Sequence, residues 1–338
     1  MHKRMYKTIL IALCMLILIL DTKTVISGAS EGLTLCFHVL IPSLLPFFLI
    51  SVLLTSQLSG VTSTILRPIG TLLRIPNGTE SLFLVGILGG YPVGAQVISQ
   101  AVQSGFLPRR EANRMIAFCN NAGPAFIFGV ISAQFPNLYY SWVIWATIIL
   151  SSIFSAILLP GGKRNRVTAQ SKKHITVTEA MGASIKALSG VCGWVIIFRV
   201  IMKFLERWIL WIFPIQIQIF INSILELANG SLALSQIESI GLRLIICTAG
   251  LSFGGICVLL QTAAVADELN LKLYLLGKCL QTIISVLLVL PSSLAMEYGL
   301  SFDLAAGSTA SILLFLLILS YYRKKHENNS GNLILSGV

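Results

Sequence analysis

Long apolar segments alternate with short polar ones along most of this chain. Many of the apolar segments approach the roughly 20 residues that a helix needs to cross a bilayer, and short basic clusters between them are typical of loops beside membrane spans. The pattern predicts an all-α polytopic membrane protein with about eight to nine transmembrane helices. The expected spans and interrupted segments cover residues 8–20, 33–58, 81–101, 115–135, 139–159, 183–205, 208–237, 241–266, 271–291 and 304–322.

Two segments of the first half are broken in the middle by residues that a spanning helix normally avoids. In hydrocarbon every backbone N–H and C=O needs a partner, so a broken helix survives only inside protein or beside a wet cavity. Paired breaks are typical of transporter substrate sites built from discontinuous helices, so the pattern indicates solute translocation. The first break contains Gly89, Gly90, Tyr91, Pro92, Val93 and Gly94, and the second contains Asn120, Asn121, Ala122, Gly123 and Pro124.

Segment 81–101 has basic residues on both sides, with Arg67 and Arg74 before it and Arg109 and Arg114 after it. Both its ends are therefore expected in the cytoplasm, and the segment is expected to form a re-entrant helical hairpin. The alternative is a helix whose small residues allow close packing. The expected gate of the hairpin consists of Gly89, Gly90, Pro92 and Gly94.

The basic linker 161–178 divides the chain into two similar halves. Each half reads as span, hairpin, broken span and span, but the two halves begin from opposite sides of the membrane. This order predicts an inverted repeat of the kind found in alternating-access transporters. The expected units are an N-terminal transmembrane anchor (1–30), a first repeat (31–160), the linker, a second repeat (179–300), a C-terminal transmembrane helix (301–322) and a tail (323–338), with both termini cytoplasmic.

The register of the second half stays open. The hairpin is expected within 208–237, but a different register would place it at 241–266, because Gly250 and Gly254 repeat the spacing of the first hairpin. Three cations fall on the expected outer side and count against the scheme: Lys203, Arg207 and Arg243.

Asn120 and Asn121 are candidate substrate ligands, because side-chain amides at membrane depth are costly unless they are paired. Gly123 unwinds easily and Pro124 leaves an earlier carbonyl unpaired. The half-helix that begins here would attract an anion through its partial positive charge. Gln96 would bind the solute or bond a neighbouring helix. The alternative for the asparagine pair is an amide clamp between helices, without any ligand.

Glu226 is the corresponding candidate in the second half. An ionisable group at membrane depth is a functional hypothesis by default, so Glu226 would bind solute or carry a coupling proton; the alternative places it in water at the interface. Arg199 would clamp an anion or extend toward the interface. The other candidates here are Asn229 and Ser252 as substrate ligands, and Gly230, Gly250 and Gly254 as gating or hairpin residues.

The composition excludes several classes of function. Only 11% of the 338 residues are charged, against about 25% in soluble domains. The net charge of +11 comes mostly from short clusters beside apolar segments, so no nucleic-acid partner is expected. The seven cysteines and four histidines lack metal-ligand spacing, and neither a nucleophile–base set nor a phosphate loop is visible. We therefore expect no metal, no cofactor and no enzymatic activity.

These motifs resemble the sporulation integral membrane protein family YlbJ, also called SpoVV, over roughly residues 30–320. The resemblance implies a nucleoside recognition or Gate domain, related to concentrative nucleoside transporters with two re-entrant hairpins. It also implies a role in endospore formation, with dipicolinic acid passing the outer forespore membrane. The resemblance rests on the motifs 89–95, 109–114, 120–124, 126–129, 226–230 and 250–255.

The sequence leaves the solute open between an anion and a nucleoside. Dipicolinate would need amides and a cation such as Arg199, whereas a nucleoside would need amides and an aromatic ring such as Tyr91. The scarcity of buried acids favours an anion. Transport coupled to protons or sodium, a homo-oligomer, and a non-transporting scaffold in a sporulation membrane complex are further expectations to be weighed.

Overall fold

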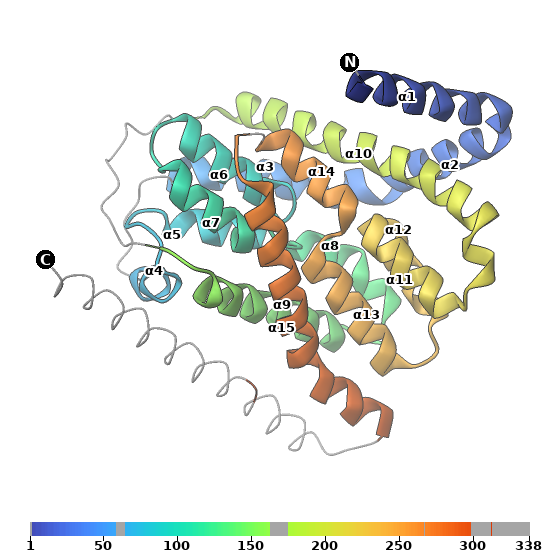
Figure 1. Cartoon of the computed structure of the whole chain (residues 1–338). Helices are drawn as coiled ribbons and strands as arrows, with labels where there is room; N and C mark the ends of the chain where they lie inside the picture. Colours follow the sequence, from blue (N-terminus) through green and yellow to red (C-terminus); the bar gives the residue numbers. More distant parts are fainter. Residues whose placement is uncertain (1, 59–64, 163–174, 267, 299–311, 313–338) are drawn as a thin grey trace, which may run out of the picture.

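The computed structural model describes residues 2–58, 65–162, 175–266, 268–298 and 312, and the regular elements in these ranges are helical. The helices are packed into one body, from which α1 (His2–Leu20) extends (Figure 1). The expected C-terminal helix at 301–322, the tail, and most of the basic linker lie outside the described residues.

The chain crosses the body first through one long helix. Asp21 ends α1, and its carboxylate accepts a hydrogen bond from the backbone N–H of Thr24 at the start of α2 (Thr22–Leu35). A π-helical turn, η1 (Cys36–Leu40), joins α2 to α3 (Ile41–Leu58). The expected boundary at residue 30 therefore falls inside a continuous helix, which starts earlier than the predicted span at 33–58.

A helical hairpin follows the short helix α4 (Arg67–Leu73). Helices α5 (Glu80–Gly89) and α6 (Val93–Gln103) pack against each other, and the chain reverses between Gly90 and Pro92. Gly90 has a φ of +74°, which a residue with a Cβ adopts only at a cost. The reversal lies where the sequence predicts the first hairpin.

The next segment is helix, extended chain and helix again. Helix α7 (Arg109–Cys119) is followed by extended residues 120–123 and by the six-residue helix α8 (Pro124–Gly129). Helix α7 begins at Arg109, directly after its N-cap Pro108, and therefore earlier than the predicted segment 115–135. The turn η2 (Ile131–Gln134) and α9 (Tyr139–Leu158) complete the first half.

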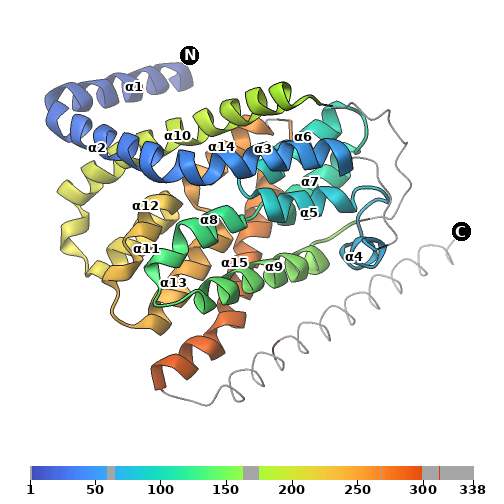
Figure 2. The same cartoon turned by 180° about the vertical axis from the view of Figure 1, so that it is seen from behind.

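The second half of the chain is also helical throughout its regular elements in the described ranges. The long helix α10 (Val177–Trp208) runs beside α2 and α3 (Figure 2). A hairpin follows, formed by α11 (Ile215–Leu225) and α12 (Leu227–Leu232), which pack against each other. Short turns surround it, η3 (Leu210–Ile212) and η4 (Leu234–Gln236). The remaining helices are α13 (Ile240–Phe253), α14 (Gly255–Val265) and α15 (Leu271–Tyr298).

This arrangement places the second hairpin within 208–237. The alternative register is not followed, because α13 and α14 form one span, Ile240–Val265, that is bent at Gly254. Gly254 has a φ of +88° and ends α13 in the left-handed conformation.

Five helices in the described ranges are long and apolar enough to cross a membrane. The expected count of eight to nine is not confirmed, because the hairpin helices are shorter than a bilayer and the last expected span lies outside the described residues. The five spans are Thr22–Leu54, Tyr139–Leu158, Val177–Trp208, Ile240–Val265 and Leu271–Tyr298.

Candidate functional site

The tip of the first hairpin lies directly against the break between α7 and α8. A Cβ placed on Gly90 would come within 2.8 Å of the backbone nitrogen of Gly123, and a Cβ on Gly123 within 2.8 Å of the Gly90 Cα. No side chain fits between two backbones at this separation. The sequence-predicted residues Gly90 and Gly123 are therefore brought together by close backbone packing.

Tyr91 extends this junction into the second half. Its hydroxyl donates a hydrogen bond of 2.6 Å to the carbonyl of Leu251, near the bend between α13 and α14. A Cβ on Gly254 would lie 3.2 Å from the Tyr91 ring, and one on Gly255 would lie 3.1 Å from the Ile224 carbonyl of the second hairpin. Both hairpins, the break after α7 and the bend between α13 and α14 thus meet in one region.

A small cavity of about 50 Å³ lies at this meeting point. One water molecule needs roughly 10–15 Å³ of such space, so the cavity has room for a few waters. Four of the residues that the sequence analysis singles out line it: Gly89, Gly90, Gly123 and Glu226. The other lining residues are mostly apolar: Leu40, Leu44, Tyr91, Ala125, Phe126, Val191, Val195, Leu227, Ala228, Val258 and Gln261.

Glu226 stands at the tip of the second hairpin and is buried, with 3% of its surface exposed. Its carboxylate caps α12: it accepts hydrogen bonds from the N–H groups of Ala228 (2.9 Å) and Asn229 (2.7 Å), and from the Asn229 side-chain amide (2.7 Å). A carboxylate satisfies the unpaired N–H groups of a helix start well. The position in water at the interface, considered from the sequence, does not apply to this buried side chain.

Asn229 faces a second, larger cavity of about 570 Å³, which is lined by polar and apolar surface in similar amounts. This outer cavity lies between α2, α10 and the second hairpin. Glu226 lines the central cavity and Asn229 lines the outer one, so the hydrogen-bonded pair separates the two. Polar lining residues of the outer cavity include Ser30, Glu31, Thr34, His38, Arg199, Glu206, Gln218, Asn222 and Gln236.

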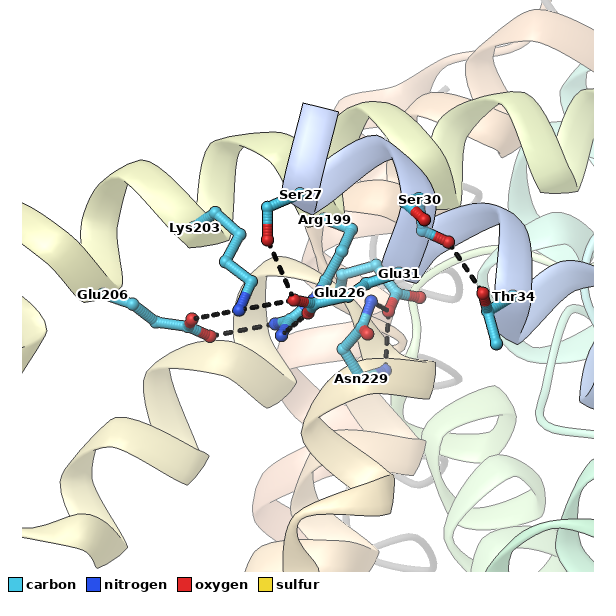
Figure 3. Close-up of polar contacts among 9 residues, drawn as sticks. All are labelled: Ser27, Ser30, Glu31, Thr34, Arg199, Lys203, Glu206, Glu226 and Asn229. Carbon is cyan, nitrogen blue, oxygen red and sulfur yellow. Dashed lines mark hydrogen bonds and ion pairs between the residues drawn. The ribbon is translucent and has the colours of Figure 1, made fainter. Parts of the chain in front are cut away.

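An ion cluster stands at the edge of the outer cavity (Figure 3). Arg199 donates to Glu31 of α2 and, at 2.9 Å, to Glu206 on its own helix. Lys203 pairs with Glu31 at 2.7 Å and with Glu206 at 3.7 Å. Two cations and two carboxylates balance, so Arg199 is paired with acids here rather than open to an anion or extended toward the interface.

Asn120 and Asn121 are buried in the extended break, where their amides bond to protein groups. Asn120 donates to the hydroxyls of Thr262 (2.9 Å) and Tyr274 (3.2 Å), and its oxygen accepts from the backbone N–H of Ala95 (3.2 Å). Neither asparagine is among the residues that line the two cavities. The clamp between helices considered from the sequence therefore describes the hydrogen bonds of Asn120 in this conformation.

Asn121 belongs to a second polar cluster that the sequence did not reveal. Its side-chain oxygen accepts from Lys278 Nζ (3.0 Å) and from Gln281 Nε2 (2.8 Å), while its amide donates to the Phe118 carbonyl (2.7 Å). Lys278 also donates to Gln281 Oε1 (2.8 Å). A signal was available, since Tyr274, Lys278 and Gln281 share one face of a helix at spacings of four and three.

The remaining predicted ligands are dispersed around this region. Ser252 Oγ and Gln96 Oε1 are buried atoms for which the described residues provide no hydrogen-bond partner. Pro124 begins α8, which has only six residues. Gly94 lies against the Cys119 carbonyl, and both Gly230 and Gly250 lie against Ser223. Pro92 precedes α6 as its first flanking residue. Within the described ranges, His, Cys, Asp and Glu form no group that could hold a metal ion.

Comparison with known proteins identifies a relative of this chain. The sporulation integral membrane protein YlbJ of Bacillus subtilis is 25% identical over 340 aligned positions, gaps included. The match covers 84% of this chain and 82% of the relative. The chain is a homologue of that protein. No family model and no solved structure matches it. Together with the apolar spans, this homology identifies a multi-pass integral membrane protein in a lipid bilayer.

Proposed function

We propose that this protein is a membrane carrier, not an enzyme, which moves a small polar anion across a membrane during sporulation. Homology to a sporulation integral membrane protein supports the sporulation role. One observation carries the transport proposal. Both hairpins, the break after α7 and the bend between α13 and α14 meet near buried Glu226, beside two cavities. Discontinuous helices that meet inside a bundle are the usual construction of carrier sites.

The proposed architecture is an inverted repeat like that of concentrative nucleoside transporters. Long helix, hairpin, broken helix and long helix follow in this order twice, first from α2 to α9 and again from α10 to α15. The hairpin helices are too short to cross a bilayer singly, as expected for re-entrant segments. The break after α7 and the bend between α13 and α14 both lie against protein. Irregular backbone at membrane depth must be buried in this way or line a cavity.

The proposed path runs from the outer cavity past the Asn229–Glu226 pair to the central cavity. The central cavity is too small for a solute of drug-like or metabolite size, which needs roughly 300 Å³ or more. This conformation would therefore be a closed state, and movement of a hairpin tip would enlarge the central site. Alternating movement of the two hairpins would expose that site to each side in turn.

Dipicolinic acid, carried across the outer forespore membrane, is the solute that the family resemblance favours. A planar dicarboxylate needs a cationic or amide-rich site, and the interior contains Asn229, Gln261 and Lys278 near the junction. A nucleoside is the second candidate, because Tyr91 and Gln261 line the central cavity and could stack against and bond a neutral base. Coupling to protons or sodium belongs to the same proposal.

Uptake into proteoliposomes tests the proposal. Purified protein should accumulate labelled dipicolinate above protein-free vesicles, and a proton or sodium gradient should change the initial rate. Excess unlabelled dipicolinate should abolish the signal, while a nucleoside should not. Uptake of the nucleoside alone would replace the substrate assignment. No uptake of either compound by correctly folded protein, under either gradient, would favour the scaffold of a sporulation membrane complex.

A further inference from the structure

We propose that Lys278 is the cationic group that binds a carboxylate of the carried solute, with Tyr91 as the movable ring that covers it. This inference rests on the proposed function and assigns the charge-recognition step within it. Lys278 lies two turns inside α15, one of the membrane-spanning helices. Lys278 is fully buried, because α15, the break after α7 and the first hairpin enclose it.

The partners of Lys278 are uncharged. Its ammonium group donates to the side-chain oxygens of Asn121 and Gln281, at 3.0 and 2.8 Å, and it faces the rings of Tyr91 and Tyr274 at 5.5 and 5.9 Å. Among the described residues no carboxylate forms an ion pair with it. An ionisable side chain at membrane depth is expensive, and it normally marks a substrate or ion pathway.

Tyr91 connects this ammonium to the central cavity, because it lines the cavity and its ring also faces the Lys278 ammonium at 5.5 Å. The ring is held by the hydrogen bond from its hydroxyl to the Leu251 carbonyl, which links the first hairpin to the second half. If the hairpin tip moves, this bond breaks and the ammonium becomes accessible from the enlarged cavity.

A carboxylate suits the exposed ammonium better than its present partners do. An ionised oxygen attracts the ammonium with a full opposite charge, whereas an amide oxygen has only a partial charge. Two amide oxygens nevertheless remain beside Lys278 to accept its hydrogen bonds when the solute leaves. The cluster therefore offers a site that can bind an anion and release it again, as a carrier requires. Asn121 would then act by holding the lysine in place.

Competition between charged and uncharged analogues tests the assignment. Pyridine-2,6-dicarboxylate and its neutral dicarboxamide have similar shapes, so their ratio of inhibition constants for labelled dipicolinate uptake reports charge recognition. The parent protein and Lys278→Arg should prefer the dicarboxylate, and Lys278→Met should lose on the order of tenfold of that preference. Lys272→Met is the matched control, because Lys272 is an exposed lysine on the same helix.

A purely structural role gives a different result. In Lys278→Met, inhibition by both analogues would then weaken by the same factor, and the preference for the dicarboxylate would remain. That result would overturn the inference. Failure of the parent protein to take up dipicolinate would instead refute the proposed carrier. If Lys278→Met does not fold, acetylation of Lys278 by acetic anhydride in Tyr91→Ala, followed by mass spectrometry, replaces it. The dicarboxylate should slow this acetylation, and equal protection by the dicarboxamide would refute the role of Lys278.

Discussion

Buried charges at the junction are stabilised in two different ways. Glu226 accepts three hydrogen bonds from α12, so its charge is compensated within a single turn of the chain. Arg114, on α7, donates to backbone carbonyls, those of Leu73 and Ala156 among them. Lys278 has only amide oxygens and rings. Lys278 therefore differs from Glu226 and Arg114, because its partners among the described residues include no backbone group.

The cap formed by Glu226 leads to a first prediction. Glu226→Gln keeps the side-chain volume but leaves one acceptor oxygen where two accept now, so an amide group would face the N–H of Ala228 or Asn229. Losing one charge-assisted bond of about 1.5 kcal/mol should loosen the hairpin tip and lower the initial uptake rate on the order of tenfold. Glu238→Gln, at an exposed position beyond the same hairpin, is the control and should retain the parent rate.

Sequence reasoning at this scale depends on whether partners are close along the chain. Glu226 and Asn229 are three residues apart, so their shared role at a helix start is visible in the sequence. Asn121 and Lys278 are 157 positions apart, and only the packing of α15 on α7 joins them. Lys278 therefore reads from the sequence alone as one more basic residue near a span end.

At the scale of elements, the contact between the tip of the first hairpin and the break after α7 leaves no space for a side chain. Gly90→Ala would add a Cβ at a φ of +74° and 2.8 Å from the Gly123 nitrogen. Positive φ alone costs roughly 1–2 kcal/mol, and the clash must also displace the tip. We expect a lower unfolding temperature in detergent and a large loss of uptake.

Gly193→Ala provides the matched control for this substitution. Gly193 lies on α10, and a Cβ placed there meets no atom within 4 Å. A helical alanine in open space should keep or slightly raise the unfolding temperature. Equal behaviour of the two variants would contradict the close backbone contact at the hairpin tip.

The seam between α2 and α10 is held by both close packing and charge. A Cβ on Gly28 would lie 2.8 Å from Val200 Cα, and the ion cluster of Glu31 and Arg199 lies on the same seam. A double-mutant cycle with Glu31→Gln and Arg199→Gln should give a coupling of about 1 kcal/mol in the free energy of unfolding in detergent.

The pair Asp21–Arg207 on the same two helices gives the comparison for that cycle. The side chain of Arg207 is 59% exposed, against 16% for Arg199, so solvent should screen its ion pair more strongly. A coupling for Asp21–Arg207 equal to or larger than that for Glu31–Arg199 would contradict the importance of the cluster at the outer cavity.

The elements themselves were largely predictable, and their junctions were not. Apolar length and glycine or proline breaks locate α9, α10, the first hairpin and the break at 120–123. Helix starts depend on local caps instead, so α7 begins at Arg109, after Pro108 and before the predicted start at residue 115. Gly250 and Gly254 were ambiguous because a bent span and a hairpin share the same residues, and only packing distinguishes them.

At the scale of the whole molecule, loops gather at two ends. At the expected cytoplasmic end, Arg109 lies 3.3 Å from Glu268 in an ion pair. At the expected outer end, Arg243 donates to the Gln134 carbonyl at 2.7 Å. Residues from both halves thus contact each other at each of these ends.

The three cations that count against the expected direction of insertion have local partners. Arg243 also donates to the carbonyls of Ser235 and Ile237, at a place where helical turns end. Lys203 pairs with Glu31, and Arg207 pairs with Asp21 at 3.0 Å. The orientation of membrane spans is set by basic residues in short loops. Cations that form ion pairs or bond helix ends are therefore weaker evidence for the direction of insertion than the basic linker is.

Cysteine labelling tests the direction of insertion. Ser104→Cys and Glu238→Cys place thiols at exposed positions of the two ends. An impermeant maleimide should label position 104 only from the cytoplasmic face and position 238 only from the outer face. The background for both variants needs Cys14→Ser and Cys279→Ser, because these two cysteines are the exposed ones in the described ranges. Labelling of both positions from one face would show that the loops at the two ends share a compartment. The inverted order of the halves would then be lost, and with it the alternating access on which the carrier depends.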